Sequence, residues 1–474
     1  MLVEMKTFAF SEIIRALRRP NQTRSRYPMN QHPTRCCGAR NLVPMVFFLW
    51  AITSFALADH WPNWRGQDHN GISRETELPT VWSEQEGVLW NSPLPEWGNS
   101  TPVIWDDAIF LTCHVDDRDL LLVKLDRTSG TIDWTRTVGT ASTPRGTSGV
   151  TGEAARGQQK FHATQNLASP SCTVDGDVVI AHFGSGDLAA YDFAGKRLWH
   201  RNLQEDYGRY TIWWGHANSP VLHGDAVISV CMQDSLVDLG KPPAPSYVVA
   251  HHKRTGQLLW YTPRPTSAMS EPCDSYTTPV LQPTDDGIEM ILFGGLVLDA
   301  YDPNTGRRLW QLSGFTGNRV IPGPVVSGEK VYVTQGMRNP LVAVRRGVSG
   351  PLDANPALWS YDRGTSDSPT PVVYRDLLYF VTNDGFATAL DTETGDVVWR
   401  ERLPGQYRAS PLAAAGRIYF QNVSGLTTVV EASREFRKIA ENKLDDETLA
   451  SPVSAAGHLY IRTRQALYCL GSHP

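Results

Sequence analysis

A chain of 474 residues has room for about two or three average domains, so only an internal pattern can settle how many it has. Its 15 Trp, 39 Gly and 32 Pro are typical of a turn-rich chain of many short strands. The net charge of −5 gives no overall attraction to a polyanion, which disfavours nucleic-acid binding.

The first 58 residues are predicted to be a leader. A basic, polar stretch of 40 residues precedes the apolar run Leu42–Ala58, which ends in the small-residue pattern Ala56-Leu57-Ala58. Such an exit is what a signal peptidase needs, so we expect cleavage before Asp59 and a mature protein in the periplasm or outside the cell. The alternative is a membrane anchor, but the run is short for one. Met29 is an alternative start, since it would give a leader of more usual length.

The cysteines argue against a disulfide framework. Cys36 and Cys37 leave with the leader, and no CxxC or CxxCH motif remains for zinc, redox or haem chemistry. An odd number of widely spread cysteines is left in the mature chain: Cys113, Cys172, Cys231, Cys273 and Cys469.

One phrase returns along the mature chain. Ala300–Trp310 and Ala389–Trp399 both have the form AxDxxTGxxxW, and degenerate copies end at Trp134, Trp199 and Trp260. Asp and Thr in such a turn bond to backbone amides, Gly supplies a positive φ, and Trp can pack between neighbouring units. These residues are therefore expected to be structural. The predicted packing positions are Trp90, Trp134, Trp199, Trp260, Trp310 and Trp399.

A second phrase precedes the first. It is a Ser/Thr-Pro step followed by two β-branched runs around a tight polar turn, as in Ser169-Pro170, and it occurs seven times with Pro322-Gly323-Pro324 as a variant. Each unit is then four short antiparallel strands, and units of about 40 to 50 residues without helices between them are propeller blades. We expect an all-β, eight-bladed β-propeller over residues 59–474. Seven blades is the alternative, because the copy ending at Phe436 is degenerate.

The two ends of this domain complete each other. Gly87–Trp90 is an outer strand without a start, and the last start, Ser451-Pro452, has no outer strand after Cys469. We expect the two segments to form one closing blade, which leaves no open edge in the ring.

The repeated residues resemble the tryptophan-docking motif of the PQQ-like, quinoprotein-type β-propellers. That family includes quinoprotein alcohol dehydrogenases, the scaffold propeller of outer-membrane barrel assembly, and secreted bacterial proteins of unassigned activity. The opening Trp61–Gly66 is similar to that of the secreted members. The resemblance implies the fold and leaves the activity open, because one fold carries many functions.

The long connections point to the binding face. They cover 138–168, 201–218 and 233–246, and all leave blades on the side opposite the short turns. The candidate ligand or partner residues are Trp97, Asn99, His162, Asn166, Tyr210, Trp213, Trp214, His216 and Asn218. Equivalent entries elsewhere round the ring hold Arg145, Tyr276, Arg319, Asp367, Tyr407 and Arg408.

Three functions compete for this face. A PQQ-dependent dehydrogenase of alcohols or sugars would, by the resemblance, need Ca²⁺ held by Glu, Asn and Asp, an Asp base and commonly an adjacent Cys pair; the sequence shows none of these clearly. We therefore expect no catalytic residue, no metal and no cofactor, with PQQ and calcium as the alternative. The favoured function is non-catalytic binding or scaffolding in the bacterial cell envelope, with an envelope protein or a polysaccharide as the partner.

Overall fold

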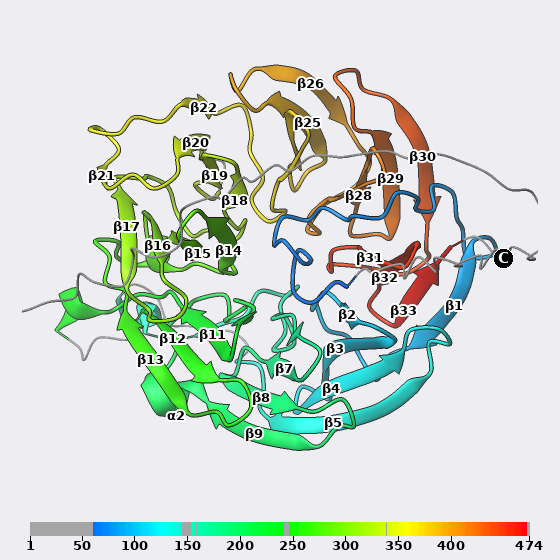
Figure 1. Ribbon diagram of the computed structural model, residues 1–474, viewed down its shortest axis with the longest axis horizontal. Coiled ribbons are helices and arrows are strands. Elements are labelled where there is room, and N and C mark those ends of the chain that lie inside the picture. Colours follow the sequence, from blue (N-terminus) through cyan, green and yellow to red (C-terminus); the bar gives the residue numbers. More distant parts are fainter. Residues whose placement is uncertain (1–59, 145–152, 158, 241–245, 338, 472–474) are drawn as a thin grey trace, which may run out of the picture. The chain divides into compact units, whose positions relative to one another are not determined.

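The computed structural model describes residues 60–144, 153–157, 159–240, 246–337 and 339–471. The predicted leader and its cleavage site, and Arg145, lie outside these ranges. Eight sheets stand around a common centre (Figure 1), so the chain is an eight-bladed all-β propeller and the alternative of seven blades is wrong. Within the described ranges, no helix is long and apolar enough to span a membrane.

The blades follow one another along the chain, each running from its inner to its outer strand. Blades 1 to 4 contain β2 (Val103–Trp105), β3 (Ala108–Val115), β4 (Asp119–Asp126) and β5 (Ile132–Thr140); β6 (Thr173–Val174), β7 (Val179–His182), β8 (Asp187–Tyr191) and β9 (Arg197–Asn202); β10 (Val221–His223), β11 (Ala226–Cys231), β12 (Tyr247–His252) and β13 (Leu258–Pro263); β14 (Val280–Thr284), β15 (Gly287–Gly294), β16 (Val297–Tyr301) and β17 (Arg308–Ser313).

Blades 5 to 8 continue in the same order. They contain β18 (Val325–Ser327), β19 (Lys330–Thr334), β20 (Leu341–Arg345) and β22 (Trp359–Tyr361); β23 (Val372–Tyr374), β24 (Leu377–Val381), β25 (Phe386–Asp391) and β26 (Val397–Arg402); β27 (Leu412–Ala414), β28 (Arg417–Gln421), β29 (Leu426–Glu431) and β30 (Lys438–Lys443); β31 (Val453–Ala455), β32 (His458–Arg462), β33 (Ala466–Leu470) and β1 (Val88–Pro93). The short β21 (Gly350–Pro351) adds a parallel edge to β17. The short helices are α1 (Glu153–Arg156), α2 (Leu203–Tyr207), η1 (Val237–Leu239) and η2 (Glu271–Cys273).

The hydrophobic core lies between neighbouring blades. The middle strands of each sheet are buried on both faces, so they are continuously apolar instead of alternating; β11 and β19 are examples. One cluster joins Ile180 of blade 2 to Val227 and Val249 of blade 3. Each blade is therefore stabilised mainly by the two blades beside it.

The docking tryptophans fasten one blade to the next. The indole of Trp260 donates to the carbonyl of Pro303 in the following turn at 3.2 Å. In that turn Thr305 and Asn304 bond to Asp302, and Gly306 has a φ of +69°. A Cβ on Gly306 would lie 2.4 Å from the Trp260 ring, so only glycine allows the indole to close onto the turn. Trp90, Trp199 and Trp359 meet Gly130, Gly256 and Gly395 in the same way.

Two positions depart from this pattern for structural reasons. Trp310 donates instead to Glu289 of its own blade at 2.8 Å, and Glu289 pairs with Arg346 of blade 5. The turn before the outer strand of blade 5 lacks the full DxxTG motif. In β30 the register position of a docking tryptophan is taken by Ala440, opposite Val429, and the expected aromatic Phe436 lies instead in the turn before β30, edge-on to Trp399 at 5.2 Å. The next blade, blade 8, has no turn before its outer strand, because that strand comes from the other end of the domain. A tryptophan at position 440 would have no turn to dock on.

Blade 8 combines both ends of the described chain. β1 pairs antiparallel with β33, and Trp90 lies opposite Cys469. Residues from both termini therefore share one sheet (Figure 1).

The segment from His60 to Arg74 runs through the centre of the ring, drawn in blue in Figure 1. Trp61 exchanges two backbone hydrogen bonds with Ile104 of β2, and Gly71 and Ser73 bond to Ala413 of β27. The buried guanidinium of Arg65 donates to carbonyls at the entries of blades 6 and 7, those of Thr370, Pro371 and Pro411. This central segment thus ties the inner strands of blades 1 and 7 to each other and to the entry of blade 6.

Candidate functional site

The two faces of the ring are built differently. Each inner strand runs from the entry of its blade to a short turn, so all eight entries lie on one face, together with the turns between the two middle strands. We call this the long-loop face, because the connections 141–172, 203–220 and 232–246 all belong to it. The DxxTG turns lie on the other, plain face.

The structure divides the nine sequence candidates into two groups. His162 is exposed, and Trp97, Asn99, Trp213 and Trp214 are half-buried, so these side chains can meet a ligand. The other four candidates are buried, with at most 1% of the residue exposed: Asn166, Tyr210, His216 and Asn218.

The four buried residues hold the connections in place. Asn218 donates to the carbonyls of Ser275 and Thr277 at 3.1 and 2.7 Å, and Tyr210 stacks on His216 with ring centroids 4.8 Å apart. Burial lowers the pKa of His216 to about 4, so this ring is neutral near pH 7. The burial of these four side chains argues against contact with a ligand: Asn166, His216 and Asn218 bond to backbone carbonyls, and Tyr210 packs on the His216 ring.

The exposed candidates join residues from the other side of the ring. Trp214 donates its indole N–H to Glu271 at 3.1 Å, and Asn318 donates to the second oxygen of Glu271 at 3.1 Å. Arg319 lies 3.7 Å from Glu271 and 3.5 Å from Asp367. Contacts therefore run without a break from the entry of blade 3 to the entry of blade 6.

Cations also gather here. The ammonium of Lys160 lies over both indoles, 4.1 Å from the ring centre of Trp213 and 4.5 Å from that of Trp214. The edge of His162 faces Trp214. Burial, and then the positive charges of Arg408 and Arg319, lower the pKa of His162. We call the group the mouth cluster: Lys160, His162, Trp213, Trp214, Glu271, Arg319, Asp367 and Arg408.

A buried carboxyl lies beneath the mouth cluster. Asp274 accepts from the backbone N–H of Trp213 at 2.9 Å, while its other oxygen is buried without a hydrogen-bond partner. Burial raises the pKa of Asp274 well above its ordinary range. One guanidinium nitrogen of Arg319 is also buried without a partner. One donor nitrogen of Arg319, in the mouth cluster, and one oxygen of Asp274, beneath it, are thus left without a partner.

Sequence reasoning missed Lys160, Glu271, Asp274 and Asn318. A sequence signal could have found these residues, because polar residues a few positions before a blade entry occur repeatedly in the mouth cluster. Of the other entry residues, Tyr276 accepts from the backbone N–H of Trp214 with its buried hydroxyl, and Tyr407 is buried.

The residues at the mouth do not fit calcium and a quinone. Both oxygens of Glu271 are taken by Trp214 and Asn318, and the amide oxygen of Asn318 accepts from the backbone N–H of Arg319 at 2.8 Å. A guanidinium stands beside the carboxylate, where a cation would be repelled. In the described ranges no three His, Cys, Asp or Glu side chains are grouped to hold a metal. Ca²⁺ needs at least six free oxygen ligands, and this donor set offers no such opening.

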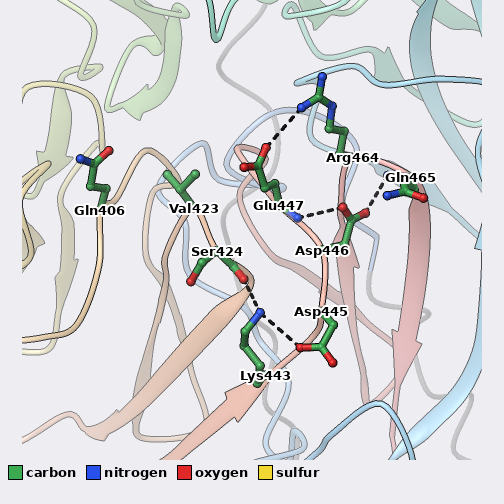
Figure 2. A pocket seen from close by; sticks show the side chains of 9 residues that line it. All are labelled: Gln406, Val423, Ser424, Lys443, Asp445, Asp446, Glu447, Arg464 and Gln465. Atoms are coloured by element: carbon green, nitrogen blue, oxygen red, sulfur yellow. Dashed lines mark hydrogen bonds and ion pairs between the residues drawn. The ribbon is translucent and has the colours of Figure 1, made fainter.

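A second hollow lies over blades 7 and 8 on the same face. Figure 2 shows its lining: Lys443 bonds to the carbonyl of Ser424 and to Asp445, and Glu447 pairs with Arg464 at 3.3 Å. Its volume is about 800 Å³. The charges in this groove are largely paired with one another.

Comparison with known proteins gives a family and a fold. A family model described as outer membrane protein assembly factor BamB matches residues 72–273 and 352–435, more than half of the chain. No curated protein sequence matches the chain significantly.

Solved structures share the fold at low identity. BamB from Moraxella catarrhalis is 13% identical with a TM-score of 0.55, covering 81% of this chain and 99% of its own. A europium-containing methanol dehydrogenase is 11% identical with a TM-score of 0.63, covering 87% and 98%. A quinohemoprotein alcohol dehydrogenase from Comamonas testosteroni is 11% identical with a TM-score of 0.63, covering 88% and 81%. At these identities the structures are informative about the fold alone.

Proposed function

Because this chain belongs to the family of the outer membrane protein assembly factor BamB, we propose that it is a non-catalytic binding or scaffolding propeller of the bacterial cell envelope. Its partner is a protein, and the partner is bound at the mouth cluster of the long-loop face. The proposal includes export of the chain to the periplasm or the cell exterior, as expected from residues 1–58.

The mouth cluster carries this proposal. Its two indoles, three cations and two carboxylates come from six connections between blades, and all of these connections lie on the long-loop face. Mixed aromatic and charged residues of this kind, above all Trp and Arg, are enriched where proteins bind proteins.

Two observations favour a protein over a polysaccharide and over catalysis. Lys160 covers one face of both indoles, which reduces the aromatic surface that a sugar ring could stack on. The oxygen ligands that a calcium-bound quinone would need are engaged with Trp214, Asn318 and Arg319. The central segment also crosses the ring, which supports binding at the mouth instead of passage through the channel.

Site-specific cross-linking in native envelopes tests the proposal. A photo-reactive phenylalanine derivative at position 213 should cross-link to one discrete partner. The same group at Asn304, exposed on the plain face, is the matched control and should give no such product. Equal cross-linking from both positions, or from neither, would contradict the proposal.

An activity assay tests the alternative directly. Purified protein supplied with PQQ and Ca²⁺ should show no dye-linked oxidation of alcohols or sugars. Turnover that depends on added PQQ and disappears when Ca²⁺ is chelated would establish the dehydrogenase function instead.

A further inference from the structure

A small pocket opens on the long-loop face where blades 1 and 8 meet. It is lined by residues 97–99 before β2, by residues 163–164, and by residues 462–464 at the end of β32, with Val423, Glu447 and Leu449 completing the wall. Its volume is about 160 Å³, several times the roughly 30 Å³ that one water molecule occupies in the liquid. It has room for a group the size of a carboxylate with its first few attached atoms.

Arg462 lines this pocket with a buried charge. Only 1% of Arg462 is exposed. Its guanidinium donates to the carbonyl of Ser100 at 2.9 Å and to that of Thr112 at 2.7 Å, and it also contacts the hydroxyl of Ser100. Its Nε is buried without a hydrogen-bond partner. Among the described residues no carboxylate forms an ion pair with this group.

Of the three buried arginines in the described ranges, Arg65 and Arg462 have no carboxylate partner. Arg264 is equally buried, and it is paired with Asp299 at 2.9 Å. Burying a guanidinium without an opposite charge is costly, because carbonyl dipoles replace only part of its hydration. Arg462 ties blade 8 to blade 1 through the carbonyls of Ser100 and Thr112.

The rim of the pocket does not cancel this charge. Arg464 lies over the Trp97 ring, 4.6 Å from its centre, and pairs with Glu447 at 3.3 Å. The one carboxylate in the lining is therefore balanced by Arg464, and the charge of Arg462 stays unneutralised. Gly98 packs closely on Arg462, because a Cβ there would lie 2.5 Å from the guanidinium.

We propose that this pocket is an anion-binding subsite that takes one carboxylate group of the protein partner, either an acidic side chain or the chain end. This inference rests on the proposed function and adds the chemistry of the ligand. The pocket shares Val423, Glu447 and Arg464 with the groove of Figure 2, so an extended peptide lying in the groove can place its carboxylate next to Arg462. An anion bound there gains the attraction of a cation with little solvent screening.

Small probes test the subsite without the partner. N-acetylglycine carries the carboxylate of a peptide end, and N-acetylglycinamide has the same shape without the charge. In calorimetric titrations at low ionic strength, we expect the acid to bind at least tenfold more tightly than the amide. Equal binding of the two probes, or binding of neither, would overturn the proposal. Tighter binding of glucuronate than of N-acetylglycine would also overturn it, because the carboxylate would then belong to a sugar.

A pocket-filling variant avoids disturbing Arg462, whose removal can unfold the junction of the blades. Ala163 is exposed and lines the pocket, so Ala163→Phe should fill it and weaken N-acetylglycine at least tenfold. Ala154→Phe, in exposed α1 and away from the pocket lining, is the matched control and should bind like the unmodified protein. Undiminished binding by Ala163→Phe would contradict the assignment. If cross-linking from position 213 succeeds while N-acetylglycine fails to bind, the subsite is refuted and the proposed function stands.

Discussion

At the scale of single residues, the docking turns depend on glycine for two separable reasons. Gly306 and Gly328 both have positive φ, +69° and +57°, so alanine at either position costs about 1 to 2 kcal/mol of backbone strain. A Cβ on Gly306 also meets the Trp260 ring, whereas nothing lies within 4 Å of one on Gly328. We expect Gly306→Ala to lower the free energy of unfolding by about 1 to 3 kcal/mol more than Gly328→Ala. Equal losses in urea denaturation would mean that the indole does not press on the turn.

Buried histidines should make the fold sensitive to mild acid. Burial lowers the pKa of His69 and of His216 to about 4, below the ordinary value of 6.5. As the pH falls from 6.5 towards 4, the unfolded chain binds protons at these sites before the folded chain does, so each site removes about 1 kcal/mol of stability per pH unit. Above pH 7 both states are neutral at these sites and the effect vanishes.

Replacing His216 measures its contribution to this loss of stability at acid pH. His216→Gln keeps a donor for the Val230 carbonyl that His216 contacts at 2.9 Å, and it removes the titrating ring. Between pH 6.5 and 4.5, the slope of unfolding free energy against pH should decrease by about 1 kcal/mol per unit. An unchanged slope in denaturation series would show that His216 is protonated in the folded protein.

At the scale of the blade, the contribution of an aromatic side chain should follow its burial and its docking contact. Trp399 in β26 is 7% exposed and donates to the carbonyl of Ser433 in the next blade at 3.1 Å. Phe436 is half-buried in the turn before β30 and packs edge-on against Trp399. Trp399→Ala should therefore cost about 3 to 5 kcal/mol, and Phe436→Ala about 1 to 2 kcal/mol. Calorimetric melting of the two variants compares them, and a larger loss at Phe436 would refute the ranking.

Sequence could predict the blades because each repeat carries its own evidence. The Ser/Thr-Pro entry, the turn and the tryptophan are local, and eight copies give eight sheets. The mouth cluster could not be predicted in the same way. Lys160 and Arg408 are far apart in the sequence, and only the closing of the ring brings their connections to one side. Asn218 was predicted to contact a ligand because it is polar and lies near a blade entry. Its amide instead donates to two backbone carbonyls, and no sequence pattern identifies these partners.

At the scale of the whole molecule, the first prediction concerns processing. The pattern Ala56-Leu57-Ala58 predicts cleavage before Asp59. N-terminal sequencing of protein from the envelope fraction should begin at or near Asp59. Cytosolic protein with residues 1–58 intact would contradict export, and with it the envelope function, while leaving the fold unaffected.

The sheet shared by β1 and β33 also governs how the molecule can fold. Trp90 meets its partner Cys469 only after all the intervening blades are in place. Contacts between residues so far apart in the sequence form slowly, because closing a long loop costs entropy before any contact compensates for it. During that interval the edge of β33 is a row of unpaired backbone groups, open to the β1 of any neighbouring chain. Refolding yield should thus fall as protein concentration rises, with exchange of β1 between chains as the route to dimers.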